Sequence, residues 1–365
     1  MTIGKVRVAL LFLLFTSGLA RFASGLAADD QQQLDGRLAA SETRRLAAAG
    51  IRRIEFRGPG NLGGELRLRA EANTSDVKIE INKHVHNIAA GERATRILGA
   101  ISLATAVAAD LLTIEVKTPA AAEWEGSQIG VRADLDILVP TGLVFTGESE
   151  FYDFDLSGPL REVRIAGKFG KIRVQGVTEA ANLRTEFGVL SLTDARGGAE
   201  VNNQYGAITL QQITVGETPL RVGTQYGAID ASKITGPVEI TTDTAPVEIT
   251  DWTLEKGLSR IEGHAATIKV QFARWGAPQV TIENENAKVE VTIPKDFSAR
   301  IRLAVGEEGG GRIRTRGVSV KATRLDRWII EGIAGRGAGL LEVNSGDYGD
   351  ILLGGPLTRP RSSGG

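Results

Sequence analysis

The chain has 365 residues, enough for one large domain or two ordinary ones, and its 45 glycines separate short runs of Val, Ile, Leu and Thr typical of an all-β protein. Its 43 basic and 44 acidic residues nearly cancel, so bulk charge indicates no nucleic-acid or anionic-membrane partner. The lack of cysteine excludes disulfides, thiolate metal sites, a cysteine nucleophile and a lipidated N-terminal cysteine.

Residues 1–27 have the features of an export signal. Lys5 and Arg7 precede an apolar run from Val8 to Phe15, and small residues follow up to Ala27, where we expect cleavage. Earlier cleavage and an uncleaved anchor are alternatives, although the apolar run is shorter than the ~20 residues of a membrane span. We therefore predict an extracytoplasmic protein (periplasmic, cell-surface or secreted) that meets the membrane only through this signal.

Residues 28–142 are predicted to form an N-terminal strand region that contains one packed helix. Asp29–Gly50 carries a weak helical stripe, and the main helix is predicted from Ala89 to Leu112, where Ala, Leu and Ile dominate. Alternation of apolar and polar residues predicts strands at Ile51–Arg57, Gly64–Ala70, Val77–Lys83, Leu112–Lys117 and Gln128–Val139.

The segment Gly58–Gly63 reads GPGNLG and matches the glycine fingerprint of dinucleotide-binding proteins. That fingerprint needs a following helix whose N-terminus points at the pyrophosphate. Here the strand-like run ELRLRA follows. We therefore expect a glycine-rich hairpin loop at this place and no nucleotide site.

Residues 143–355 contain a repeat, which is clearest in KFGKIRV (Lys168–Val174) and QYGAITL (Gln204–Leu210). Each copy aligns on one apolar residue, here called the anchor, and successive anchors are 18 or 21 residues apart: Phe154, Ile172, Leu190, Ile208, Ile229, Val247, Ile268 and Val289. The position two after the anchor is apolar, and so is the position seven before it from the second copy on. Such columns predict an all-β chain folded as a β-solenoid (parallel β-helix-like) with rungs of 18–21 residues and two strands a rung.

The position two before the anchor is small from the second copy on: Gly170, Gly188, Gly206, Gly227, Ala245, Ala266 and Ala287. Glycine at such a place permits a positive φ or a tight corner that side chains would obstruct. We therefore predict a corner of each rung at this column.

Outward positions carry opposite charges in neighbouring copies. Asp153 is followed one copy later by Lys171, and Asp155 by Arg173. Neighbouring strands lie only ~4.8 Å apart, so a slip by one rung would place like charges together. This pattern predicts parallel, in-register rungs; a sandwich of antiparallel strands is the alternative.

The position three before the anchor is aromatic in five consecutive copies: Phe151, Phe169, Phe187, Tyr205 and Tyr226. The structural interpretation is a stack of rings at a corner, and the functional one is a sugar-binding platform. From these rings and the charges beside them we predict a binding face for a glycan or a cell-surface protein, consisting of Phe169, Phe187, Tyr205, Tyr226, Glu150, Asp153, Asp155, Lys171 and Arg173.

The repeat fades after Val291 and returns near the C-terminus. The run GEEGGG within Pro294–Gly311 predicts a loop, whereas Leu340–Gly355 again places Tyr348 and Ile351 in the expected slots. A closing strand is predicted around Ile329. Residues 356–365 are predicted to be a disordered tail.

The export signal, the N-terminal strands with their helix, the YGxI-type copies and the closing NSGDYGDILL resemble a bacterial family of putative adhesins of unknown function with β-strand repeats. The resemblance covers roughly Ile51 to Leu353 and implies an adhesin-like structural or binding role at the bacterial envelope. It brings no catalytic residues with it. The chain departs from the family pattern in the loop around Glu307–Gly311.

Catalytic and metal-binding motifs are not found in the sequence, so no catalytic, cofactor or metal residue is assigned. His84 and His86 lie two apart on one strand face, which by itself makes half of a zinc site. Because parallel β-helices include polysaccharide lyases and hydrolases, such an enzyme is the alternative function. Its candidate residues are Glu148, Glu150, Asp153 and Asp155 beside Lys168, Lys171 and Arg173.

Overall fold

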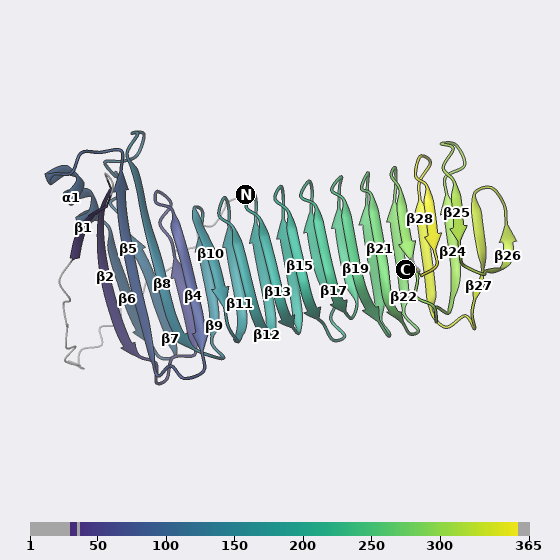
Figure 1. Cartoon of the computed structure of the whole chain (residues 1–365), viewed down its shortest axis with the longest axis horizontal. Coiled ribbons are helices and arrows are strands. Elements are labelled where there is room, and N and C mark those ends of the chain that lie inside the picture. The colour runs from purple at the N-terminus through teal and green to yellow at the C-terminus, as the bar shows by residue number, and fades with distance from the viewer. Residues whose placement is uncertain (1–29, 35–36, 357–365) are drawn as a thin grey trace, which may run out of the picture.

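The computed structural model describes residues 30–34 and 37–356, which form one elongated β-solenoid (Figure 1). The strands run across its long axis, with helix α1 (Glu92–Ala100) at one end and strand β26 (Lys321–Leu325) at the other. The predicted export signal and residues 357–365 of the predicted tail lie outside the described residues. No helix of the described part has the length and hydropathy needed to cross a bilayer.

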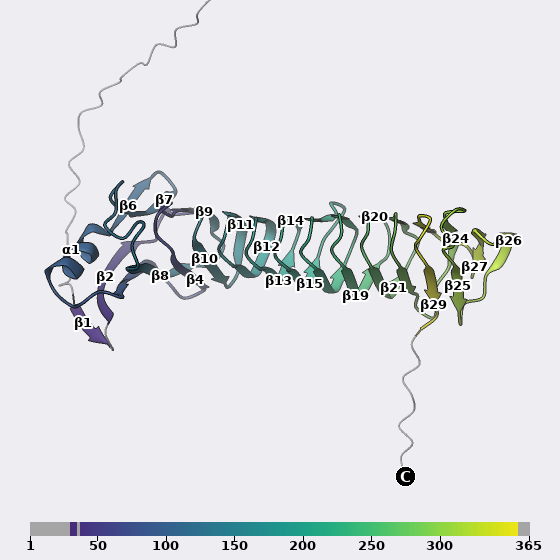
Figure 2. The ribbon, with the colours of Figure 1, turned by 90° about the horizontal axis from the view of Figure 1, so that it is seen from above.

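Each central rung gives one strand to each of two sheets, which face each other across a shared apolar core (Figure 2). The first sheet holds the anchors, and its central strands are β10 (Tyr152–Ser157), the first half of β12 (Ile172–Thr185), β13 (Leu190–Arg196), β15 (Ile208–Thr214), β17 (Ile229–Thr235), β19 (Val247–Leu254), β21 (Ile268–Trp275) and β23 (Val289–Thr292). The central strands of the second sheet are β9 (Val144–Ser149), β11 (Leu160–Gly167), the second half of β12, β14 (Gly198–Asn203), β16 (Leu220–Thr224), β18 (Val238–Thr242), β20 (Leu258–Gly263) and β22 (Gln279–Asn284).

The predicted columns are the hydrogen-bonding register of the structure. Phe154 pairs with Ile172 in parallel, and anchor follows anchor in the same way up to Val289. The column seven before the anchor stacks equally, from Ile165 to Ile282. Every anchor is at most 1% exposed. The solenoid prediction is confirmed, and the antiparallel sandwich is wrong.

The glycine column is explained by close approach of backbones and not by positive φ. A Cβ at Gly188 would lie 1.8 Å from the carbonyl oxygen of Gly170, and one at Gly227 would lie 1.8 Å from that of Gly206. None of the column glycines is among the positive-φ residues of the described chain. Of the two predicted reasons, the tight corner is confirmed and the positive φ is wrong.

Positive φ occurs at a second corner, four residues after the anchor, which the sequence did not reveal. Glycine occupies this position in two rungs, and Asp, Gln or Lys occupies it in four. The φ values are 97° at Gly158, 87° at Gly176, 50° at Asp194, 57° at Gln212, 55° at Lys233 and 54° at Asp251. Here the chain turns from the first sheet toward the second.

An antiparallel cap closes the N-terminal end. Its strands are β1 (Asp30–Leu34), β2 (Arg37–Ala47), β5 (Asp76–His86) and β8 (Gly130–Pro140) on the first sheet, and β6 (Ser102–Ala108) and β7 (Leu111–Lys117) on the second. β2 pairs with β5 over ten residues, Leu38 to Ala47, so the predicted helical stripe in Asp29–Gly50 is wrong. Long-range strand pairing overrides a weak local preference.

The predicted helix Ala89–Leu112 is confirmed only in its first half. α1 ends at Ala100, Ile101 is extended, and β6 then pairs with β7 from Ser102 to Ala108. Ala94, Ile97 and Leu98 are buried on one face of α1. The remaining Ala-rich run extends the second sheet, because an edge strand can still bond through its backbone whatever its side chains prefer.

The glycine-rich run Gly58–Gly63 is not a hairpin. It joins β3 (Arg53–Arg57) to β4 (Gly64–Glu71), but β3 pairs with β7 and β9, whereas β4 pairs with β8 and β10. The run therefore crosses from the second sheet to the first, as the repeat does at its aromatic corner. β7 and β8 also pair in parallel with β3 and β4, so the parallel stacking begins at β7 and β8.

At the C-terminal end the last strands of the sequence lie inside the stack. β28 (Leu340–Ser345) lies between β22 and β24 (Ala299–Val305), and β29 (Ile351–Gly354) lies between β23 and β25 (Ile313–Arg316). Ile351 pairs with Val289, so its predicted anchor position is confirmed. β27 (Ile329–Ala334), the predicted closing strand, pairs with β24 and β26.

Candidate binding surface

A column of buried polar side chains shapes the corner that carries the aromatic residues. It lies five residues before the anchor and includes Asn203, which is 2% exposed. Asn203 accepts a hydrogen bond from the Gly206 N–H (3.2 Å) and donates one to the Gly188 carbonyl (2.6 Å). In the next rung the Thr224 hydroxyl accepts from the Gly227 N–H at 3.0 Å. These bonds fix the turn, and the aromatic residue within each turn, Tyr205 or Tyr226, points outward.

The sequence carried a signal for this column that the prediction missed. Small polar residues recur where an inward side chain would otherwise be apolar: Ser149, Thr185, Asn203, Thr224, Thr242 and Asn284. A buried hydroxyl or amide is tolerated only when its hydrogen bonds are made. A repeated polar residue on an inward face therefore indicates a repeated turn.

The five outward aromatic residues form a continuous stack along this corner, the aromatic ladder: Phe151, Phe169, Phe187, Tyr205 and Tyr226. Successive ring centroids are 5.3, 5.2, 4.8 and 5.3 Å apart, with interplanar angles of 2° to 12°. The side chains remain 41% to 55% exposed. The predicted stack of rings at a corner is confirmed, and it lies open to solvent along its length.

Stacking decides which part of each ring is accessible. A ring between two neighbours at about 5 Å has both faces covered, so its edge is what solvent meets. The ladder therefore presents a row of ring edges, and ring faces are free only at its two ends. A sugar-binding platform needs faces, so the middle of the ladder suits an apolar partner surface better than a stacked sugar.

The surroundings of the ladder change along its length. The position one before the anchor is Asp153 and Lys171 in the first two rungs, but Val189 (46% exposed) in the third, followed by two exposed alanines. The Lys168 ammonium lies 5.4 Å from the centre of the Phe169 ring. The charges of the predicted face thus gather at Phe151 and Phe169. Exposed Glu186 still precedes Phe187, whereas Tyr205 and Tyr226 are flanked by glutamines and alanines.

Two of the predicted charged residues lie beyond the corner, on the outer face of the first sheet. Asp155 pairs with Arg173 at 3.5 Å, as the alternating charges predicted. Asp153 instead accepts a hydrogen bond from the backbone N–H of Lys171 at 2.7 Å. Ion pairs between neighbouring rungs also join Lys269 to Glu248 at 2.6 Å on the first sheet and Arg221 to Glu239 at 3.0 Å on the second. Exposed pairs of this kind each contribute up to about 1 kcal/mol and mainly fix register.

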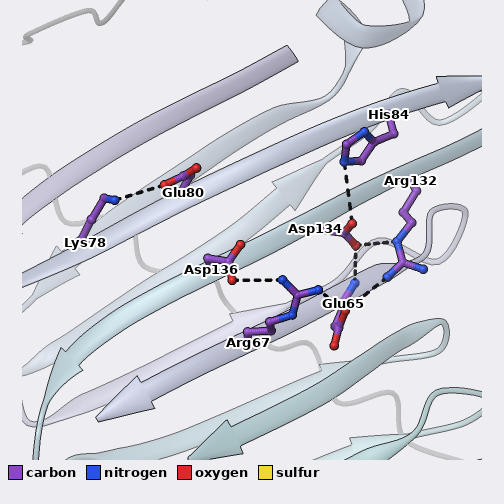
Figure 3. Close-up of polar contacts among 8 residues, drawn as sticks. All are labelled: Glu65, Arg67, Lys78, Glu80, His84, Arg132, Asp134 and Asp136. Atoms are coloured by element: carbon purple, nitrogen blue, oxygen red, sulfur yellow. Dashed lines mark hydrogen bonds and ion pairs between the residues drawn. The ribbon is translucent and has the colours of Figure 1, made fainter. Parts of the chain in front are cut away.

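The charged surface continues onto the N-terminal cap (Figure 3). Asp153 is in register with Glu65 on the neighbouring strand β4. Glu65 forms an ion pair with Arg67 at 2.6 Å, and Asp134 forms one with Arg132 at 2.6 Å. The hydrogen bond from Arg67 is the main reason that the pKa of Glu65 lies below its ordinary value. A general acid needs a carboxyl pKa raised toward the working pH. The local charges therefore act on Glu65 in the direction opposite to acid catalysis.

An acid-rich depression lies farther along the same corner. Its volume is about 420 Å³, and it is lined by Thr242, Glu262, Gly263, His264, Glu283, Asn284, Glu285, Asn344 and Gly346. His264 Nδ1 is 2.5 Å from a Glu285 oxygen, and Arg260 forms an ion pair with Glu283 at 2.7 Å. The sequence did not reveal this depression, because its walls come from separate rungs.

The two strand histidines have different surroundings. His84 Nε2 is 3.9 Å from an Asp134 oxygen, and the ring of His86 packs over Gly130, the residue that pairs with it. In the described part of the chain, no three His, Cys, Asp or Glu side chains are arranged to hold a metal ion.

Neither a protein-family model nor a curated protein matches the chain. Among solved structures, it is similar to a putative adhesin from Bacteroides fragilis at 11% identity and a TM-score of 0.33, with 86% of this chain and 96% of that chain covered. It is also similar to a putative lipid binding protein from Parabacteroides distasonis, at 10% identity and a TM-score of 0.30 over 86% and 96%. A putative cell adhesion protein from Clostridium sporogenes is similar at 10% identity and a TM-score of 0.22, over 87% and 100%. Bacterial proteins described as a putative adhesin and a putative cell adhesion protein are thus among the solved structures to which this chain is similar.

Proposed function

We propose that this chain is an exported, non-catalytic binding module of the bacterial envelope, adhesin-like in role. The observation that carries the proposal is the aromatic ladder, in which five large rings lie in one exposed row. Contiguous exposed apolar surface on a soluble protein marks an interaction site, because water makes it costly to leave uncovered. The expected partner is a glycan or a protein of a cell surface.

The rigidity of the ladder supports binding. Each ring is held by its stacked neighbours and by a turn whose polar groups are hydrogen-bonded, as in Asn203 and Thr224. Rings that are already ordered lose little conformational entropy when a partner docks. A solenoid also repeats the same contact at every rung, so weak contacts add along its axis.

The strip around Phe187, Tyr205 and Tyr226 is the part best suited to a partner surface. Val189 and two alanines flank it on one side, and Gln204 and Gln225 bond to each other at 2.9 Å on the other. Docking there removes apolar surface from water, and the one charged residue that directly adjoins these three rings in the sequence is exposed Glu186, before Phe187.

Export is proposed from residues 1–27, whose basic start and apolar run have the pattern of a signal. Fractionation of cells that carry a C-terminally tagged chain tests this part. The tag is expected in the periplasmic, surface or secreted fraction, and a cytoplasmic tag would contradict the location.

Binding and catalysis are separated by two assays on the purified full chain. Retention on bacterial cell surfaces without release of sugar from a panel of polysaccharides is the expected result. Sugar release that disappears in Glu285→Gln would instead support the lyase or hydrolase alternative, with the acid-rich depression as its site.

A further inference from the structure

The N-terminal end of the aromatic ladder leaves one ring face uncovered. Tyr152 pairs with Gly64, which places Gly63 opposite Phe151 in the preceding rung. A Cβ on Gly63 would lie 3.5 Å from the Cβ of Phe151. Gly63 thus stands where a sixth ring would begin, and it has no side chain to cover the outer face of Phe151.

A depression of about 620 Å³ lies at this uncovered face. It is lined by Gly60, Asn61, Leu62, Gly63, Glu125 and Phe151. Its volume falls within the usual range of small-molecule sites, ~300–1,000 Å³. The glycine-rich run that resembles a nucleotide fingerprint is therefore one wall of an open hollow, and an aromatic ring is another.

The polar groups of this hollow are held in place. Asn61 donates to Glu125 Oε1 at 2.6 Å and to the Pro119 carbonyl at 3.1 Å, and its Oδ1 accepts from the Thr118 hydroxyl at 2.6 Å. The indole of Trp124, 8% exposed, donates to the Asn61 carbonyl at 2.9 Å. Within residues 30–34 and 37–356, no hydrogen bond uses Glu125 Oε2, so this oxygen can accept from a ligand.

We propose that this hollow binds one neutral pyranose unit of a glycan. The face of an aromatic ring carries partial negative charge and attracts the slightly positive C–H groups of a sugar ring, which would lie on Phe151. Sugar hydroxyls would donate to Glu125 Oε2. A carboxylate in the site repels uronic and sialic acids, so the hollow selects neutral sugars.

The inference rests on the proposed function, because it names the glycan-binding part of the same corner. It also divides that corner into two kinds of surface. Ring edges in the middle of the aromatic ladder suit an apolar partner, whereas the free face of Phe151, beside fixed polar groups, suits a sugar.

The test is binding of the full chain to a panel of neutral and acidic oligosaccharides, followed by calorimetric titration of the best ligand. Neutral ligands are expected to bind, and Phe151→Ala to weaken binding by about tenfold, the loss of ~1.4 kcal/mol of contact with one ring face. Phe151→Leu keeps an apolar side chain without the flat face and is expected to weaken binding similarly. Glu125→Gln is expected to lower affinity and to reduce the preference for neutral over acidic sugars.

Tyr348→Ala is the matched control, because Tyr348 is an aromatic residue, 73% exposed, outside the aromatic ladder. It is expected to leave sugar binding unchanged. Failure to bind any neutral sugar overturns the inference, as does full affinity in both folded Phe151 variants or an equal loss in Tyr348→Ala. If the chain still binds cell surfaces in those cases, the inference fails while the proposed function stands; if neither sugars nor cells bind, both fail.

Discussion

Gly206 shows how a single residue sets the spacing of the rungs. A Cβ at this position would lie 2.1 Å from the Gly188 carbonyl oxygen and 2.7 Å from the side-chain nitrogen Nδ2 of Asn203. Gly206→Val must push two rungs apart and break the turn, which we expect to destabilise the chain by about 3 kcal/mol. Chemical denaturation monitored by circular dichroism measures this change.

Gly198→Val is the control for that substitution. No atom lies within 4 Å of a Cβ at Gly198, and its φ is not positive, so valine is expected to be tolerated. Equal stability of the Gly206 and Gly198 variants would show that the rungs are not in close contact at the glycine column.

Two adjacent glutamines test the second corner. Gln212 has φ 57°, a conformation that strains an L-residue by roughly 1–2 kcal/mol, whereas Gln211, the preceding residue of the same strand β15, is not among the positive-φ residues. Gln212→Gly is expected to raise stability by up to about 1 kcal/mol, and Gln211→Gly to lower it by a similar amount. Thermal unfolding of both variants gives the comparison; a fall in both would contradict the left-handed corner.

At the scale of elements, the available strand partners determined the secondary structure in segments whose local composition favours a helix. The Ala-rich segments of β2 and β6 have helix-like composition, yet each lies alongside a strand that offers a full row of backbone partners, β5 and β7. Among the residues that the structure describes, the one α-helix is Glu92–Ala100, outside both sheets. The central strands were predictable because their inward residues repeat at the spacing of the rungs.

Because β28 and β29 are inserted into the stack, the attachment of β24 and β25 depends on these last two strands of the sequence. In the described part of the chain, β24 is hydrogen-bonded to the central stack through β28, and β29 is the one strand with which β25 pairs. Deleting residues 340–365 is therefore expected to abolish hydrogen-exchange protection in β24 and β25 while leaving β14 to β18 protected. Protection of β24 at its original level would mean that β24 can dock directly on β22.

At the scale of the whole molecule, the solenoid and its corner of rings were predictable, whereas the hollow at Phe151 was not. The aromatic ladder repeats in the sequence, so each ring supports the assignment of the next. Asn61, Glu125 and Phe151 come from three separate segments and are joined because β4 pairs with both β8 and β10. The acid-rich depression likewise needs the inserted β28 beside β22. Sites built across an unpredicted connection leave no pattern in the sequence.

The aromatic ladder is the surface that we propose binds the partner. The decisive measurement is the retention of two triple variants on bacterial cell surfaces. One is Phe187→Ser/Tyr205→Ser/Tyr226→Ser, and its matched control is Leu258→Ser/Leu325→Ser/Tyr348→Ser. The control side chains are 70% to 73% exposed and lie outside the aromatic ladder, so both variants remove three exposed apolar groups. Circular dichroism first checks that both variants are folded. We then predict that the ladder variant loses at least about tenfold in retention, which corresponds to ~1.4 kcal/mol of binding free energy, and that the control binds like the unmodified chain. Equal retention of the two variants would contradict the account.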